Sequence, residues 1–261
     1  SSPLMIGCDL RTIPEKTLSI ITNQEVIALN QDSLGMQAEV IERGKDYLIL
    51  SKTIQKREGK LRAVALYNRS NVIKKIRVDF DKLYLSGKVQ VRDLWNHQET
   101  GTFTEYYETL VPAHGTALIK LEGSKRHDRI CYEAEYAFMQ EYLPDNKQMA
   151  HFAYKAGASG DYIMKKLGNS PSNWAEFRKV YVSKGGEYQL KITYFSGDKR
   201  DIQIAVNESE YKQSGLCSGA WDQAAITTVK VKLHKGYNTI RLYNSNGWAP
   251  DIDKMEISKS R

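Results

Sequence analysis

The sequence predicts a mainly β protein: two β-sandwich domains preceded by one short β/α segment. Three observations lead to this prediction. Helix signals are confined to the first 35 residues, and from Ala38 onward apolar and polar residues alternate in short runs separated by glycines. A polar stretch at residues 123–129 divides these runs into two sets. Each set suits a sandwich, in which two sheets bury their apolar faces against each other.

Composition excludes several classes of protein. The 261 residues are 41% hydrophobic and 26% charged, which is not the composition of a disordered chain. No apolar run approaches the ~20 residues of a membrane-spanning helix. The formal net charge is +7, but the lysines and arginines are scattered and many alternate with apolar residues along predicted strands. We therefore expect neither a membrane span nor a nucleic-acid partner.

The cysteines and the first residues bear on localisation. Cys8, Cys131 and Cys217 are an odd number without metal-ligand spacing, so no disulfide framework is predicted, and a single bridge between Cys131 and Cys217 is left open. The residues around Ser1 lack the features of a secretory signal. We expect any export signal to lie upstream, in an extracellular, periplasmic or cell-surface protein.

Residues 1–35 contain one strand signal followed by two helix signals. Residues 3–8 are almost all apolar, as in buried parallel strands. Thr12 and Glu15 have the spacing of a capping box, which predicts a helix from about Ile13. Asn23 is placed to cap a second short helix. One β/α unit cannot bury both of its faces alone, so this segment is expected to belong to a larger assembly.

Residues 36–122 carry the first set of alternating runs. The expected strands are residues 47–50, 61–67, 76–80, 89–95 and 116–121, separated by glycines. His97 and His114 each lie beside a turn without a metal-binding partner at suitable spacing, so we expect them to serve the turns. This domain is predicted to be an antiparallel β-sandwich without chemistry of its own.

Residues 123–129 read as a linker, and residues 130–261 carry the second set of runs. The expected strands are residues 130–138, 150–154, 162–166, 174–182, 187–195, 201–206, 225–233, 238–243 and 252–257. Tyr188, Leu190 and Ile192 alternate toward one face. A second β-sandwich follows from these runs.

Three carboxylates of this domain suggest a cation site. Glu133 and Glu135 are two residues apart on an expected strand and would project from the same side, with Asp253 on the last strand. Like charges so close repel each other unless a cation or a basic residue compensates them. Calcium accepts six to eight oxygens in flexible geometry, so these three residues are candidate calcium ligands. The alternative is a pair of solvated glutamates on an edge strand.

The loop NSNGWAPD at residues 244–251 suggests a sugar site. The ring of Trp248 can stack on the apolar side of a pyranose, while Asn246 and Asp251 can bond its hydroxyls. Trp221 and Tyr162 are further aromatic candidates for the same rim. For each aromatic residue the alternative is ordinary core or loop packing.

Residues 2–35, SPLMIGCDLRTIPEKTLSIITNQEVIALNQDSLG, resemble the last β/α unit of the catalytic (β/α)8 barrel of family 27 glycoside hydrolases, the α-galactosidases. VRDLWNHQETGTF and VPAHGTALIKL resemble the Greek-key domain that follows that barrel. The resemblance implies that residues 1–35 are a barrel remnant and that the two catalytic aspartates lie on earlier strands. No catalytic residue is therefore expected here, and Asp9 and Arg11 are expected to be structural.

Residues 130–257 resemble the carbohydrate-binding modules of families 6 and 35 through the motifs YEAE, GDYI, GEYQLKITYF, IAVN, GYNTIRL and NGWAPDID. This resemblance implies a jelly roll with structural calcium at Glu133, Glu135 and Asp253. It also implies a ligand cleft at the sandwich end with Trp248, Asp251, Asn246 and Tyr162. The sequence LCSGAWDQAA departs from the usual polar loop of these modules, which leaves the role of Trp221 open.

We therefore expect the non-catalytic C-terminal portion of an α-galactosidase-like hydrolase, inactive alone, that carries a calcium-containing module for galactose-containing glycans. The expected partners are such glycans and the N-terminal catalytic barrel of the same polypeptide. One alternative is a purely structural β-sandwich appendage without sugar binding. The other is a module for a different glycan: an N-acetylgalactosaminide, an arabinopyranoside or a uronic acid.

Overall fold

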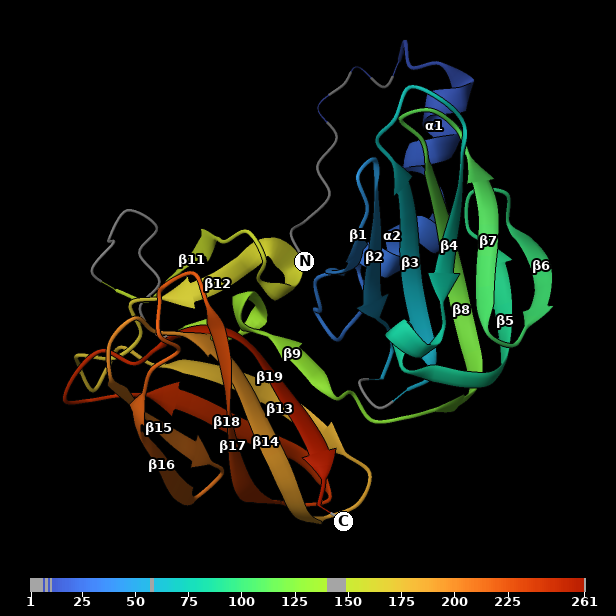
Figure 1. Ribbon diagram of the computed structural model, residues 1–261. Coiled ribbons are helices and arrows are strands. Elements are labelled where there is room, and N and C mark those ends of the chain that lie inside the picture. The colour runs from blue at the N-terminus through green and yellow to red at the C-terminus, as the bar shows by residue number, and fades with distance from the viewer. Residues whose placement is uncertain (1–6, 8, 10, 57–58, 140–148, 261) are drawn as a thin grey trace. The chain divides into compact units, whose positions relative to one another are not determined.

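The computed structural model describes Gly7, Asp9 and residues 11–56, 59–139 and 149–260 (Figure 1). The chain divides into two compact units, Ser1–His127 and Asp128–Arg261. Each unit has its own hydrophobic core, made of its own residues. In the part of the chain that the structure describes, no helix has the length and apolar character needed to cross a membrane.

Two short helices open the first unit, α1 (Glu15–Ile21) and α2 (Gln24–Asn30). The capping box predicted for α1 does not form: Pro14 is the N-cap residue, and the Thr12 hydroxyl donates to the Asp9 carbonyl instead, at 3.5 Å. The cap predicted for α2 is confirmed, because Asn23 Oδ1 accepts from the backbone N–H groups of Glu25 and Val26. The strand predicted at residues 3–8 lies outside the described residues except for Gly7, so the barrel remnant stays a prediction.

Eight antiparallel strands form the rest of the first unit. They are β1 (Glu39–Arg43), β2 (Tyr47–Thr53), β3 (Leu61–Asn68), β4 (Lys74–Asp79), β5 (Leu85–Asp93), β6 (Gln98–Phe103), β7 (Tyr106–Val111) and β8 (Thr116–Arg126), with η1 (Asp81–Leu83) between β4 and β5. One sheet has the order β1-β2-β3-β8-β5-β6, and β4 pairs with β7. Apolar residues that alternate along these strands, such as Val64 and Leu66 of β3, form the buried core.

The second unit contains two antiparallel sheets of similar size. Its strands are β9 (Cys131–Glu133), β10 (Phe138–Met139), β11 (His151–Tyr154), β12 (Tyr162–Lys165), β13 (Ala175–Val182), β14 (Gly186–Phe195), β15 (Arg200–Val206), β16 (Ser209–Leu216), β17 (Ala224–Leu233), β18 (Gly236–Tyr243) and β19 (Asp251–Lys259). One sheet has the order β10-β13-β18-β15-β16. The other has the order β11-β12-β19-β14-β17, with β9 added beside β19 (Figure 1). Both sheets contribute to one core, so the predicted mainly β fold is confirmed.

The structure corrects two local predictions. The strand expected at residues 130–138 ends at Glu133, and Ala134–Tyr136 form the 3-10 helix η2 before β10 begins. The linker expected at residues 123–129 is shorter, because β8 continues to Arg126, which pairs with Leu85. The polar composition that suggested a linker belongs to a strand end with exposed side chains.

Candidate functional site

The loop between β18 and β19 is held by its own buried asparagine. Asn244, which is 8% exposed, donates from Nδ2 to the Asp201 carbonyl at 3.0 Å and accepts at Oδ1 from the Asn246 N–H at 3.3 Å. Gln203 Oε1 accepts from the Ser245 N–H at 3.1 Å. The conformation of this loop is therefore fixed by β15 as well as by the flanking strands.

A turn around Gly168 braces the same loop from the other side. The Asn169 N–H donates to the carbonyls of Asn244 and Gly247 at 2.8 and 2.7 Å, and Gly168 forms an isolated β-bridge with Trp248. Gly168 has a φ of +93°, and a Cβ at this position would lie 2.5 Å from the Gly247 carbonyl oxygen. Only glycine combines this backbone conformation with so close an approach. The position of Trp248 thus depends on Gly168.

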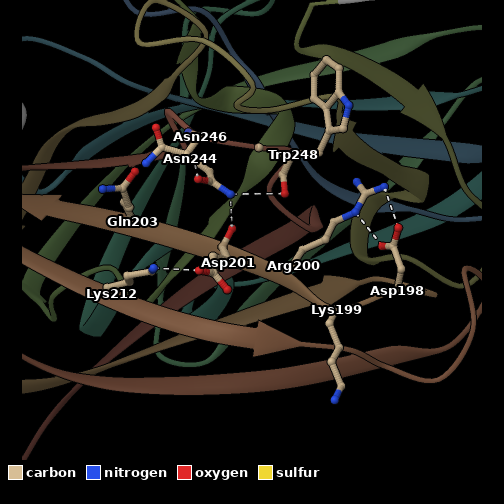
Figure 2. Close-up of a pocket in the computed structure, with 10 residues that line it drawn as sticks. Asp198, Lys199, Arg200, Asp201, Gln203, Lys212, Asn244, Asn246 and Trp248 are labelled. Carbon is tan, nitrogen blue, oxygen red and sulfur yellow. Dashed lines mark hydrogen bonds and ion pairs between the residues drawn. The ribbon is translucent and has the colours of Figure 1, made fainter.

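A hollow of about 360 Å³ lies beside this loop, within the range of about 300–1,000 Å³ typical of small-ligand sites. Its lining combines charged and amide side chains with one aromatic ring: Asp198, Lys199, Arg200, Asp201, Gln203, Lys212, Asn244, Asn246, Gly247 and Trp248. Figure 2 shows the Trp248 ring above Arg200 at one end and the amides of Asn246 and Gln203 at the other. The structure thus brings the predicted residues Trp248 and Asn246 to one hollow.

Ion pairs hold several of the lining side chains. Lys212 Nζ bonds Asp201 at 2.7 Å, and Arg200 Nε bonds Asp198 at 2.7 Å (Figure 2). Each of these lysine and arginine hydrogen bonds lowers the pKa of the carboxyl that accepts it, so both aspartates are ionised at neutral pH. Lys166 Nζ lies 4.9 Å from the centre of the Trp248 ring and covers part of one face. A ligand that stacks on Trp248 must use the remaining surface of the ring.

Asp251 lies next to the hollow and is buried, with 4% exposure. Burial raises the pKa of its carboxyl, and the charges of Lys165, Arg200 and Lys155 oppose this rise. The Lys165 ammonium is 3.7 Å from Asp251 Oδ2. Asp251 is therefore compensated by three cations, and its part in sugar recognition stays a prediction.

Trp221 and Tyr162 do not line the hollow. Arg200 Cζ lies 4.4 Å from the centre of the Trp221 ring, so Arg200 connects this tryptophan to the hollow that it also lines. Tyr162, which is 39% exposed, makes an edge contact with Tyr154 on the neighbouring strand. These two aromatic residues stay candidates for a wider rim.

The three predicted metal ligands meet around the turn η3 (Ser159–Asp161). The Ser159 hydroxyl donates to Glu133 Oε1 at 2.8 Å, and the Ser159 N–H donates to Asp253 Oδ1 at 2.9 Å. Burial and the neighbouring Glu133 raise the pKa of Asp253 to about 6. A Cβ on Gly160 would lie 2.7 Å from Glu135 Oε1, so this carboxylate also reaches the turn. The acidic pocket is defined here as Glu133, Glu135 and Asp253.

Other features of the acidic pocket bear on cation binding. Glu133 Oε2 is buried and has no hydrogen-bond partner among the described residues. Within that part of the chain, no three His, Cys, Asp or Glu side chains form a group that could hold a metal ion. Glu135 lies on η2 and not on a strand with Glu133, so the predicted same-side strand geometry is wrong. The pocket offers carboxylate oxygens of the kind that calcium takes, but not a closed shell of side chains.

Several residues near the site were missed by the sequence analysis. Arg200, Gln203 and Lys212 come from β15 and β16, and Lys155 and Lys165 come from β11–β12 and their connection. In the sequence, many of the lysines and arginines alternate with apolar residues along the strands, and this pattern predicted only that their side chains are exposed to solvent. Their proximity to the loop arises from strand pairing, which a single sequence does not reveal.

The remaining candidates lie elsewhere. Asp9 and Arg11 pair with each other at the surface, at 3.0 Å. His97 and His114 both have left-handed backbone conformations, in keeping with turn positions. Cys131 and Cys217 are free thiols. Burial, followed by the charge of Glu133, raises the pKa of the Cys131 thiol to about 12, so this thiol is protonated at neutral pH.

The second unit is a β-sandwich with a polar hollow beside the β18–β19 loop, and the first unit is a separate β-sandwich. Residues 45–121 match the family described as the alpha galactosidase C-terminal beta sandwich domain. A probable alpha-galactosidase from Dictyostelium discoideum is 37% identical over 127 residues, which are 46% of this chain and 32% of that protein. The chain spans about a third of the length of such curated relatives. It is similar to the C-terminal, non-catalytic portion of α-galactosidases.

Two solved structures extend the comparison. One is the isomalto-dextranase of Arthrobacter globiformis T6, solved with panose. The matched region covers 93% of this chain and 43% of the dextranase chain, at 21% identity and a TM-score of 0.54. At that identity the likeness establishes the fold alone. The other is a family 35 carbohydrate binding module from Clostridium thermocellum. Its matched region covers 49% of this chain and 97% of the module, at 28% identity and a TM-score of 0.45.

Proposed function

We propose that the second unit is a carbohydrate-binding module that targets an α-galactosidase-like hydrolase to galactose-containing glycans. The observation that carries the proposal is the hollow beside the β18–β19 loop, where Trp248 and Asn246 lie among fixed charged and amide groups. An aromatic ring beside convergent polar side chains suits a pyranose, which has an apolar C–H face and a hydroxylated edge. The names of the curated relatives support galactose as the sugar.

Tethering explains how such a module would serve a hydrolase. A module that holds a polysaccharide raises the effective concentration of substrate at a catalytic domain on the same polypeptide, even when its own affinity for sugar is weak. We propose that the N-terminal catalytic barrel is that partner. A hydrolase encounters polysaccharide substrates outside the cytoplasm. We therefore propose that the module acts in the periplasm, at the cell surface or in the medium.

Sugar binding is tested by calorimetric titration of the chain with α-galactosyl oligosaccharides. Trp248→Ala is expected to weaken binding by about 5- to 150-fold, because stacking on an aromatic ring contributes roughly 1–3 kcal/mol. Tyr237→Ala is the matched control, since Tyr237 is a 45% exposed aromatic residue near the start of β18, away from the loop. Equal affinity in wild type and Trp248→Ala, or no binding of any galactoside, would contradict the proposal.

We further propose that the acidic pocket binds a structural Ca²⁺ through Glu133, Glu135 and Asp253 together with a backbone carbonyl, because the three side chains alone do not form a metal-binding group. Glu133 Oε2 is buried without a hydrogen-bond partner in the described part of the chain, and the pKa of Asp253 is raised; both support this proposal, because a cation relieves the lost solvation and the repulsion between the carboxylates. When bound, the ion would join β9, η2 and β19 and so stabilise the fold.

Calcium binding is tested by thermal unfolding with and without a chelator. The melting temperature of the second unit is expected to fall when calcium is removed, since a ligand that binds only the folded state stabilises it. Glu133→Gln is expected to abolish this difference, and Glu256→Gln, on the same strand as Asp253, is expected to keep it. A melting temperature that does not respond to calcium or to the chelator would refute the site.

A further inference from the structure

The loop between β18 and β19 contains a dipeptide whose covalent chemistry the proposed function does not use. Asn246–Gly247 is the only asparagine–glycine pair in the sequence. Both residues line the hollow, and Figure 2 shows the Asn246 side chain at the end of the hollow away from Asp198. Because glycine has no Cβ, its backbone nitrogen can closely approach the side chain of the residue before it. The pair therefore brings a nucleophilic nitrogen near an amide carbon.

The side chain of Asn246 is free to react. It is exposed to solvent, and its amide makes no hydrogen bond to any residue that the structure describes. The neighbouring Asn244 is different: it is 8% exposed, and its Nδ2 donates to the Asp201 carbonyl at 3.0 Å. A buried amide must lose such bonds before it can react. The amide of Asn246 has none to lose.

The backbone nitrogen of Gly247 is also free. Its N–H has no hydrogen-bond partner within residues 11–56, 59–139 and 149–260. The Gly247 carbonyl, by contrast, accepts from the Asn169 N–H at 2.7 Å, and the Trp248 carbonyl accepts from Asn244 Nδ2 at 3.4 Å. These bonds hold the loop on the carbonyl side of Gly247 and leave its nitrogen available. Both reacting groups are thus accessible in the folded protein.

We propose that Asn246 is a site of spontaneous deamidation driven by Gly247. The Gly247 nitrogen attacks Asn246 Cγ, and the new C–N bond closes a succinimide ring. The bond from Cγ to Nδ2 breaks, and ammonia leaves with the proton that the Gly247 nitrogen releases through solvent. Water then opens the ring at either carbonyl and leaves aspartate or isoaspartate at position 246. The reaction consumes only water, and nothing is oxidised or reduced.

Deamidation changes the charge of the hollow. The lining carries three cationic side chains and two carboxylates: Lys199, Arg200, Lys212, Asp198 and Asp201. One formal positive charge is therefore in excess, and an ionised carboxylate at position 246 cancels it. The carboxylate also lacks the two N–H donors of the amide. This consequence rests on the proposed function: a galactoside that accepts a hydrogen bond from Asn246 would bind the deamidated protein more weakly.

The test is incubation of the full, folded chain at mildly alkaline pH, which helps to remove the proton from the Gly247 nitrogen. Mass spectrometry of digested samples is expected to show the exchange of NH₂ for OH at Asn246. A protein-isoaspartate methyltransferase is expected to methylate the same peptide. Asn244, which is hydrogen-bonded and precedes a serine, should stay intact over the same period. The chain unfolded in guanidinium chloride gives the reference rate.

Gly247→Ala is the matched variant. Gly247 does not have a positive φ, and a Cβ at this position would lie 3.6 Å from Asn244 Nδ2, an ordinary van der Waals distance. The loop can therefore keep its structure, while the added methyl group hinders attack by the nitrogen. Deamidation at Asn246 is expected to slow about tenfold, which corresponds to about 1.4 kcal/mol in the barrier.

Two outcomes would overturn the inference. One is an Asn246 that stays intact in the folded chain while the unfolded chain deamidates, because the loop would then protect the pair. The other is an equal rate of deamidation in wild type and Gly247→Ala.

The effect on the hollow is measured with Asn246→Asp, which imitates one product. This variant is expected to bind α-galactosyl oligosaccharides about 2- to 12-fold more weakly in calorimetric titration, the effect of losing one neutral hydrogen bond. Unchanged affinity would contradict the consequence drawn for the hollow. Fresh wild type that binds no galactoside would contradict the proposed function, whereas the mass measurement decides the deamidation independently.

Discussion

At the scale of single residues, the candidate sugar site depends on a glycine outside the lining of the hollow. Gly168 allows the Asn169 N–H to reach two carbonyls of the β18–β19 loop, and a side chain there would collide with the Gly247 carbonyl. The collision involves backbone on both sides, so it cannot be relieved by a side-chain rotation. The positions of Trp248 and Asn246 are therefore consequences of the turn before β13.

Gly168→Ala is expected to lower the free energy of unfolding of the second unit by more than the about 1–3 kcal/mol of a strained backbone residue, because the collision with the Gly247 carbonyl adds to the strain, and to weaken galactoside binding. Gly157→Ala is the control, because Gly157 has a similar φ of +85° but no atom within 4 Å of an added Cβ. Denaturant unfolding of both variants measures the difference. Equal losses in the two variants would show that the collision with the loop is unimportant.

At the scale of elements, ion pairs and hydrogen bonds attach α2 to the sheet of the first unit. Arg92 of β5 donates from Nε and Nη2 to both oxygens of Glu25, at 2.7 and 2.8 Å, and His97 Nδ1 lies 2.7 Å from Glu25 Oε1. Asn23 Nδ2 adds a hydrogen bond to the Leu94 carbonyl at 2.8 Å. Since α2 has no fully buried residue, these polar contacts carry much of its attachment.

This attachment predicts a dependence on pH. The hydrogen bond from Arg92 lowers the pKa of Glu25 from 4.5 to about 2, so the stabilisation is present above about pH 4.5 and is lost as the pH falls toward 2. Glu25→Gln is expected to lower the melting temperature of the first unit at pH 7, and the difference from wild type should shrink below pH 4.5. Glu105→Gln, at an exposed glutamate of the same unit, should show no such trend in a circular dichroism melt.

The elements that the sequence predicted well are those with buried alternating faces. Tyr188, Leu190 and Ile192 of β14 all point into the core, and their period of two was sufficient to identify the strand. The edge strand β16, by contrast, reads SEYKQSGL and is mostly exposed, so no apolar period marked it. The charges around the hollow could not be predicted from the sequence, because strand pairing determines them.

Lys165 lies near Asp251 because Met164 pairs with Ile252, and no local sequence pattern encodes this contact.

At the scale of the whole molecule, the two units have separate cores, and this separation predicts independent unfolding. Leu66 and Leu190, each fully buried, belong to the first and second core respectively. Leu66→Ala is expected to lower the stability of the first unit by about 2–5 kcal/mol, and Leu190→Ala that of the second, because each leaves a cavity in one core only. Calorimetry should show one transition shifted in each variant. A common shift of all unfolding would mean that the units melt together.

The irregular pairing of β13 with β18 has an evolutionary consequence. Phe177 pairs with Ile240, but Val180 pairs with Asn238, so β13 holds one residue more than its partner between these points, and Lys179 adopts a φ of 60° there. Loss of Lys179 by deletion would restore a regular ladder while Arg178 still points to solvent and Val180 still points to the core. The gene can therefore gain or lose one codon at this position without rearranging the sheet, and a gap here in an alignment of related modules would not signify a different surface.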